Sequence, residues 1–246
     1  MFIRSYHHIM PINFLAGQVL VFDKPYRMTS FALVSKVRWL LCRKMGVKRF
    51  KVGHAGTLDP LATGVLLLCT GRATKRIEEL QLHEKQYSAG LRLGATTPSY
   101  DLEHEIDATF PYEHITRERL EEVLAGFEGD IEQTPPVFSA CKIKGDRACD
   151  LARKGKEVSL APKRIHISRI AVNDFRLPDV NIDVTCGKGT YIRSLARDIG
   201  EALDSGAHLT SLRRTRVGDY RVEDAFTIDS FEEWLNHQEV VNELPQ

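Results

Sequence analysis

The most informative segment of the chain reads Gly53-His54-Ala55-Gly56-Thr57-Leu58-Asp59-Pro60-Leu61-Ala62-Thr63-Gly64. Its three glycines permit sharp bends and let another backbone approach closely. Asp59 is its one acidic residue. The ring of the following proline disfavours helical geometry at Asp59, so the carboxylate is expected to project from an extended loop. By spacing alone, an ordinary Asp-Pro turn and a structural role for His54 are the favoured interpretations of this segment.

Residues 65–69 follow as an uninterrupted apolar run and predict a buried strand that gives the loop a rigid support. Further strands are expected at 18–22, 87–93, 164–175 and 180–186. Strands often follow strands here without a crossover helix between them. The sequence therefore predicts an α+β fold with a mixed, mostly antiparallel sheet flanked by helices.

Two of the expected helices are marked by capping residues. Thr29 or Ser30 opens the first helix. Its predicted apolar face consists of Phe31, Val34, Val37 and Leu41. Thr190 caps the second helix, and Gly206 can end it.

The charge of the chain is balanced overall but unevenly distributed, with 34 basic and 33 acidic side chains among 246 residues. Residues 36–51 hold seven basic residues and no acidic one, residues 142–169 are also basic, and residues 101–132 are strongly acidic. A third basic group consists of Lys188, Arg193, Arg197, Arg213, Arg214 and Arg216. Any single run is typical of a solvated helix face, but three on a neutral chain favour a polyanionic partner.

The five cysteines form no CxxC pair, which argues against a disulfide framework or a zinc site and favours a reducing cytoplasm. The longest apolar run, residues 65–69, is far too short to span a bilayer. The first fifteen residues lack a continuous apolar stretch and a cleavage site, so no signal peptide is predicted.

Residues 53–64 resemble, over twelve consecutive positions, the active-site signature of TruB-family pseudouridine synthases. Other segments agree with that family in the same order: Asp23-Lys24-Pro25, Lys85-Gln86-Tyr87, Arg92-Leu93-Gly94, Gly129-Asp130-Ile131, Lys188-Gly189-Thr190-Tyr191-Ile192-Arg193, Gly206-Ala207-His208 and Leu212-Arg213-Arg214. The likeness covers roughly residues 17–229. It implies a pseudouridine synthase fold with an RNA-binding cleft across the sheet.

The resemblance also implies an activity, the isomerisation of uridine-55 in the T-arm of tRNA, without a metal, an organic cofactor or a nucleotide. We accordingly expect a monomeric enzyme that binds tRNA and no membrane. Its catalytic domain would cover residues 17–246, after a lead-in over residues 1–16 that need not be ordered. The PUA module that many relatives carry after the catalytic domain is expected to be absent.

Carried over position by position, the resemblance makes Asp59 the catalytic aspartate, Arg193 the arginine that pairs with it, and Tyr87 the aromatic residue that lies against the target base. An unperturbed aspartate, with a pKa of about 3.9, is ionised at neutral pH and can act as a nucleophile or a base. Asp101 matches a secondary acid of the active site. The surrounding residues 97–104 depart from the Asp-rich, Gly-containing pattern of the family, which weakens that assignment.

Five further positions are implied to bind or support the substrate. His54, Tyr191 and Leu212 match residues that contact RNA or the reacting nucleotide. Lys24 and Pro25 match a pair that supports the active-site cleft. Taken singly, each of these residue types is commonly structural.

The same residues argue against several other functions. Residues 187–190 lack the upstream glycine of a P-loop, no GxGxxG follows a strand, and the Asp59 loop supplies one carboxylate where a glycosidase normally needs two. Two alternatives stay open. One is a related uridine isomerase that acts on ribosomal RNA within a guide-RNA complex, and the other is a non-catalytic RNA-binding protein or tRNA-folding chaperone.

Overall fold

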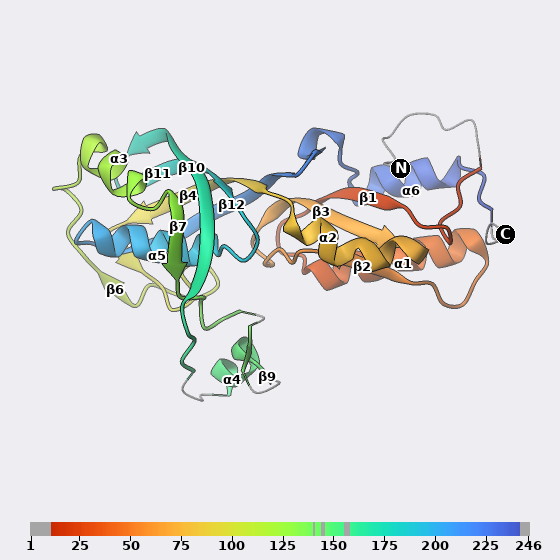
Figure 1. Ribbon diagram of the computed structural model, residues 1–246, viewed down its shortest axis with the longest axis horizontal. Coiled ribbons are helices and arrows are strands. Elements are labelled where there is room, and N and C mark those ends of the chain that lie inside the picture. The colour runs from red at the N-terminus through yellow and green to blue at the C-terminus, as the bar shows by residue number, and fades with distance from the viewer. Residues whose placement is uncertain (1–10, 140, 144–145, 155–157, 242–246) are drawn as a thin grey trace. The chain divides into compact units, whose positions relative to one another are not determined.

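The computed structural model describes residues 11–139, 141–143, 146–154 and 158–241. They form two compact units. The first contains the chain up to Lys85 together with the chain from Arg213 onward, drawn in red to gold and dark blue in Figure 1, and the second contains Gln86 to Leu212. Both units are α+β, as predicted, and most of their strand pairs are antiparallel.

The sheet of the first unit is built around β3 (Thr63–Thr70), which contains the predicted apolar strand. β1 (Val19–Lys24) pairs with β3 antiparallel along one edge. On the other edge, β2 (Val52–Ala55) pairs antiparallel, and the end of β12 (Ala207–Val217) pairs in parallel with the start of β3. A strand with neighbours on both edges and side chains buried on both faces needs the continuous apolar run that the sequence has.

α1 (Ser30–Met45) begins after Thr29, whose side chain caps the helix, and it ends at Gly46 in the left-handed conformation with φ 67°. Its buried residues are Ser30, Leu33, Val34, Val37, Leu40, Leu41 and Met45. Phe31 is 70% exposed, so the prediction that it belongs to the apolar face is wrong. With 3.6 residues per turn, Phe31 lies roughly 120° around the helix from Val37.

The remaining elements of the first unit are β13 (Tyr220–Arg221), η1 (Gly71–Arg76), α2 (Ile77–Leu82), η2 (Val222–Asp224) and α6 (Ile228–Asn236). An aromatic cluster joins α6 to β1, with ring centroids 5.0–6.1 Å apart. Its members are Phe22, Phe226, Phe231 and Trp234. This cluster fixes β1, whose last residue is the site residue Lys24.

Part of the predicted lead-in is packed into the first unit. Ile12 and Phe14 are buried, and the Ile12 N–H donates to the Glu239 carbonyl at 2.8 Å while the Val241 N–H donates to the Ile12 carbonyl at 3.0 Å. Residues 1–10 lie outside the described residues.

In the second unit, β4 (Lys85–Leu93) lies between β12 and β11 (Asp179–Cys186), followed by β10 (Lys163–Arg176) and β7 (Gly129–Gln133). β10 pairs antiparallel with both of its neighbours, and Figure 1 shows β7 and β10 running side by side. The predicted strands 87–93, 164–175 and 180–186 are thereby confirmed.

The helices of the second unit are α3 (Arg117–Ala125), α4 (Ala148–Arg153) and α5 (Ile192–Ala202), and its short strands are β5 (Ala95–Thr96), β6 (Ala108–Thr109), β8 (Lys142–Ile143) and β9 (Asp146–Arg147). Thr190 does not cap α5, because Tyr191 is the N-cap residue and the Thr190 hydroxyl donates to the Gly187 carbonyl. The left-handed residue after this helix is Asp204, at φ 53°, rather than Gly206. Within the described residues, no helix is both long and apolar enough to cross a membrane.

Candidate active site

Asp59 stands in the connection between β2 and β3, residues 56–62, which we call the Asp59 loop. The Asp59 carbonyl accepts a hydrogen bond from the Ala62 N–H at 3.1 Å, so residues 59–62 form a turn with Pro60 at its second position. The Asp-Pro turn that the spacing allowed is therefore present. Asp59 is its first residue and is partly exposed.

Arg214, on β12, fastens the first part of this loop to β3. Its side chain is buried, and it donates from Nη2 to the Gly56 carbonyl at 3.1 Å and from Nη1 to the Thr57 carbonyl at 3.5 Å. Its Nε donates to the Val65 carbonyl at 2.7 Å. One guanidinium thus connects the loop before Asp59 with the strand after it.

Gly64 allows the backbone of β12 to come this close. It has φ +99°, and a Cβ at this position would lie 2.1 Å from the Arg214 carbonyl oxygen. The expected close backbone approach at a glycine is confirmed here. The Asp23 carboxylate accepts from the Gly64 N–H at 3.1 Å and from Arg213 in a bidentate pair at 3.1 and 2.7 Å.

Lys24 holds the other end of the loop. Its Nζ is fully buried and donates to the carbonyl groups of Pro25 (2.9 Å), Met28 (2.6 Å) and Pro60 (3.2 Å). Burial lowers the pKa of Lys24 to about 8, while the negative charge of Asp59 acts in the opposite direction. The Lys24 ammonium is therefore a nearby positive charge for the Asp59 carboxylate. Pro25 is exposed beside it.

His54 lies on β2, at the entrance to the Asp59 loop, and is half-buried. Burial lowers the pKa of His54 below 6.5, and the charge of Arg214 lowers it further, so the imidazole is neutral at pH 7. Its Nδ1 is buried without a hydrogen-bond partner in the described part of the chain. No group of three or more His, Cys, Asp or Glu side chains within the described ranges could hold a metal ion.

Arg193 is the second residue of α5, and its buried side chain joins two loops of the second unit. Nη1 donates to the Ser99 carbonyl at 3.2 Å, and Nη2 donates to the Phe138 carbonyl at 3.0 Å. Nε lies 3.7 Å from Oδ2 of Asp101, which is also buried. Asp101 is thus a carboxylate beside Arg193, and its other oxygen accepts from the Glu103 N–H at 3.0 Å.

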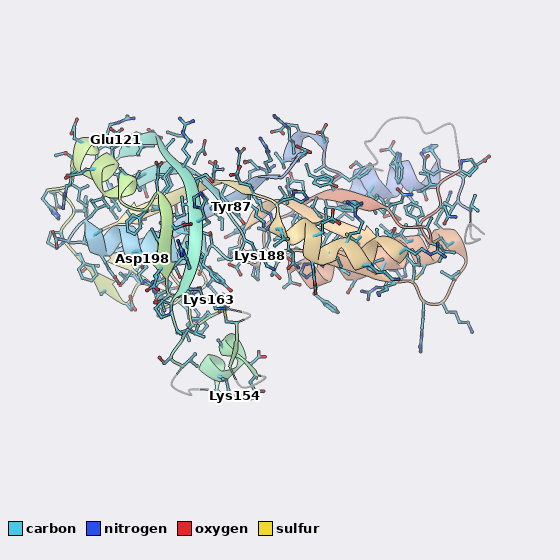
Figure 2. All side chains as sticks on the ribbon, viewed as in Figure 1. Tyr87, Glu121, Lys154, Lys163, Lys188 and Asp198 are labelled. Atoms are coloured by element: carbon cyan, nitrogen blue, oxygen red, sulfur yellow. The ribbon has the colours of Figure 1, made fainter. Side chains whose placement is uncertain are left out.

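The backbone of Tyr191 is held by one side-chain amide. Gln133, at the end of β7, accepts from the Tyr191 N–H at 2.8 Å and donates to the Tyr191 carbonyl at 3.1 Å. The Tyr191 hydroxyl lies 3.2 Å from the Cys141 Sγ. Burial would raise the pKa of the Cys141 thiol, but hydrogen bonds from Tyr191 and Ser139 and the charge of Lys163, labelled in Figure 2, bring it below the ordinary value.

The predicted site residues divide between the two units. Lys24, Pro25, His54 and Asp59 belong to the first unit; Tyr87, Asp101, Tyr191, Arg193 and Leu212 belong to the second. Within the first unit, Lys24 and Asp59 are close enough to interact electrostatically. Within the second unit, Arg193 lies beside Asp101. Tyr87, a largely buried residue of β4 labelled in Figure 2, and Leu212 flank the two points at which the chain passes between the units.

Three residues that hold these groups were not recognised from the sequence: Ser30, Gln133 and Arg214. Ser30 donates to and accepts from the backbone of Leu58, both at 2.9 Å. The sequence groups Arg214 with other basic residues, and the structure corrects this, because its side chain is buried among carbonyl groups. A signal was available for Ser30, since it lies seven residues before Val37 on the buried face of α1.

Two family models together match most of the chain. The model described as TruB family pseudouridylate synthase (N terminal domain) matches residues 43–192, and that of the tRNA pseudouridylate synthase B C-terminal domain matches residues 193–244.

The similar proteins include the tRNA pseudouridine synthase B of Phocaeicola vulgatus, 65% identical over 93% of this chain and 97% of the relative. The tRNA pseudouridine synthase B of Bacteroides thetaiotaomicron is 62% identical over 94% of this chain and 98% of the relative. A chain in the crystal structure of a Cbf5-Nop10-Gar1 complex superposes with a TM-score of 0.66 at 30% identity, over 90% of this chain and 56% of that one. The pseudouridine synthase fold is thereby confirmed, and this chain belongs to the TruB family of pseudouridylate synthases.

Proposed function

We propose that this chain isomerises uridine-55 in the T-arm of tRNA to pseudouridine and that Asp59 supplies the catalytic carboxylate. The observation that carries the proposal is the 65% identity to a tRNA pseudouridine synthase B over 97% of that relative. The TruB-like signature around Asp59 and the fixed loop that carries it add support.

The reaction breaks the N-glycosidic bond, turns the uracil and re-attaches it through carbon, so the base must first leave its stack. Tyr87 is assigned the aromatic surface for the flipped base, a contact worth about 1–3 kcal/mol. Asp59 then acts on the nucleotide as a nucleophile or a base. Either route needs an ionised carboxylate at a fixed position, and the nearby Lys24 ammonium favours the ionised form.

Arg193 is assigned the guanidinium that pairs with Asp59 in the reacting complex, and Asp101 is assigned the acid that orients Arg193. The 3.7 Å approach of Asp101 to Arg193 supports the second role. His54, Tyr191 and Leu212 are assigned to RNA contacts, and Lys24 and Pro25 to support of the Asp59 loop. The proposal includes a monomeric enzyme that needs no cofactor and works in the cytoplasm, where thiols such as those of Cys69 and Cys141 stay reduced.

The test is to incubate the purified protein with an unmodified tRNA transcript in EDTA, without nucleotide, and to map pseudouridine. Conversion at uridine-55, and none in a transcript with cytidine at that position, is expected. An isolated T stem-loop should also be converted, because its unstacked bases are the kind of target that proteins read specifically. Conversion of ribosomal RNA fragments in place of tRNA would support the guide-RNA alternative. Tight tRNA binding without conversion would support the non-catalytic alternative.

A further inference from the structure

Ser30 puts a polar hydroxyl on the apolar face of α1. The residue is 3% exposed and lies seven positions before Val37, so both side chains project from the same buried face of the helix. A buried hydroxyl is costly unless it is hydrogen-bonded. Its partners therefore show what the residue is for.

Both partners are backbone atoms of Leu58, the residue immediately before Asp59. The Ser30 Oγ accepts from the Leu58 N–H at 2.9 Å and donates to the Leu58 carbonyl at 2.9 Å. A hydroxyl can fill both roles at once. Leu58 is itself 4% exposed, so water cannot easily replace these bonds.

Two further side chains that hold the Asp59 loop are cations. Arg214 binds the carbonyl groups of Gly56 and Thr57, and Lys24 binds that of Pro60. Replacing either cation would move the loop and change the charge around Asp59 at the same time. The Ser30 contact is neutral, so its removal leaves the charge around Asp59 unchanged.

We propose that Ser30 is a positioning residue for Asp59. By fixing both polar groups of Leu58, it determines where the next residue places its carboxylate. The inference rests on the proposed catalytic role of Asp59. Displacement of a reacting group by about 1 Å can cost on the order of 100-fold in rate. Loss of the hydroxyl should therefore slow the chemical step and leave tRNA affinity nearly unchanged.

Ser30→Ala tests this inference, with Thr29→Ala as the matched control. Thr29 is the exposed neighbour whose hydroxyl caps α1 by accepting from the Ala32 N–H at 3.0 Å. We expect Ser30→Ala to lower the single-turnover rate constant, with enzyme in excess, by about 10- to 100-fold at unchanged Kd. Thr29→Ala should lower the Tm but keep the wild-type rate.

Two further measurements separate a positioning role from a general loss of stability. Amide hydrogen exchange at Leu58 should accelerate in Ser30→Ala and not in Thr29→Ala. Ser30→Cys keeps the shape with a weaker donor and acceptor, so it should lie between wild type and Ser30→Ala, and it decides the matter if Ser30→Ala does not fold. Wild-type rates in the folded Ser30 variants would overturn the inference, provided that Asp59→Asn is inactive. Activity in Asp59→Asn would instead show that the proposed function fails.

Discussion

Lys24 and Arg214 place two buried positive charges beside a loop that carries one acidic side chain. Both donate hydrogen bonds to backbone carbonyl groups, which hold them in place. Lys24 and Asp59 interact electrostatically, and the charge of Arg214 lowers the pKa of His54. The Asp59 loop thus lies among two buried cations and an imidazole whose pKa is lowered.

The lowered pKa of His54 predicts how stability depends on pH. The unfolded chain takes up a proton near the ordinary pKa of 6.5, whereas folded His54 does so at a lower pH. The unfolded state therefore binds more protons below pH 6.5, and stability is lost as the pH falls. We expect the Tm of the wild type to drop more between pH 7 and pH 5.5 than that of His54→Gln. Parallel curves for the two proteins would contradict this.

At the scale of secondary structure, the site depends on how closely β12 approaches β3. The parallel pairing of Arg214 with Gly64 brings a carbonyl oxygen to the place that a Cβ would occupy. The same pairing brings the Arg214 side chain within hydrogen-bond distance of the Gly56 carbonyl in the Asp59 loop. Strand pairing and the geometry of the Asp59 loop are therefore coupled.

Gly64→Ala should lower the free energy of unfolding more than the same substitution at Gly129. Gly129 has a similar φ of +93°, but a Cβ added there would meet nothing within 4 Å, whereas at Gly64 it would meet the Arg214 carbonyl at 2.1 Å. We expect Gly129→Ala to cost about 1–2 kcal/mol of unfolding free energy, for the left-handed backbone alone. Gly64→Ala should cost clearly more, measured by urea unfolding. Equal costs would show that the close approach is unimportant.

Local patterns in the sequence were enough to predict β3, the start of α1 and the glycine at the close approach. The clamps on the Asp59 loop could not be predicted, because Ser30 lies 28 residues from Leu58 and Arg214 lies 158 from Gly56. Residue type gives the wrong prediction for Arg214, because arginine is rarely buried and this side chain is. Which polar side chains turn inward is decided by tertiary packing.

On the scale of the whole molecule, the residues proposed for the site belong to both compact units. The basic residues differ in whether they can reach a partner. Lys48, Arg49 and Lys51 are exposed and follow α1, whereas Arg193 and Arg214 of the third basic group are buried. Any polyanion that binds must therefore rely on basic side chains other than these two.

Neutralising Lys48, Arg49 and Lys51 together, each to Gln, should flatten the dependence of tRNA affinity on salt. Each phosphate contact on a single strand contributes about 0.7 to the log–log slope, so the loss should reach about 2. Arg117→Gln with Arg119→Gln is the control, because these exposed arginines pair with glutamates on α3. Equal slopes for the triple variant and the wild type would place residues 48–51 off the RNA path.

The measurement that tests the central claim most directly is the single-turnover conversion of tRNA by Asp59→Asn, with enzyme in excess and binding measured in parallel. The amide is nearly isosteric with the carboxylate, so the clamped loop should survive, but it is neutral and a poor nucleophile or base. We predict a folded protein that binds tRNA within a small factor of the wild-type Kd and forms no pseudouridine. Appreciable pseudouridine at uridine-55 would show that Asp59 is not the catalytic carboxylate.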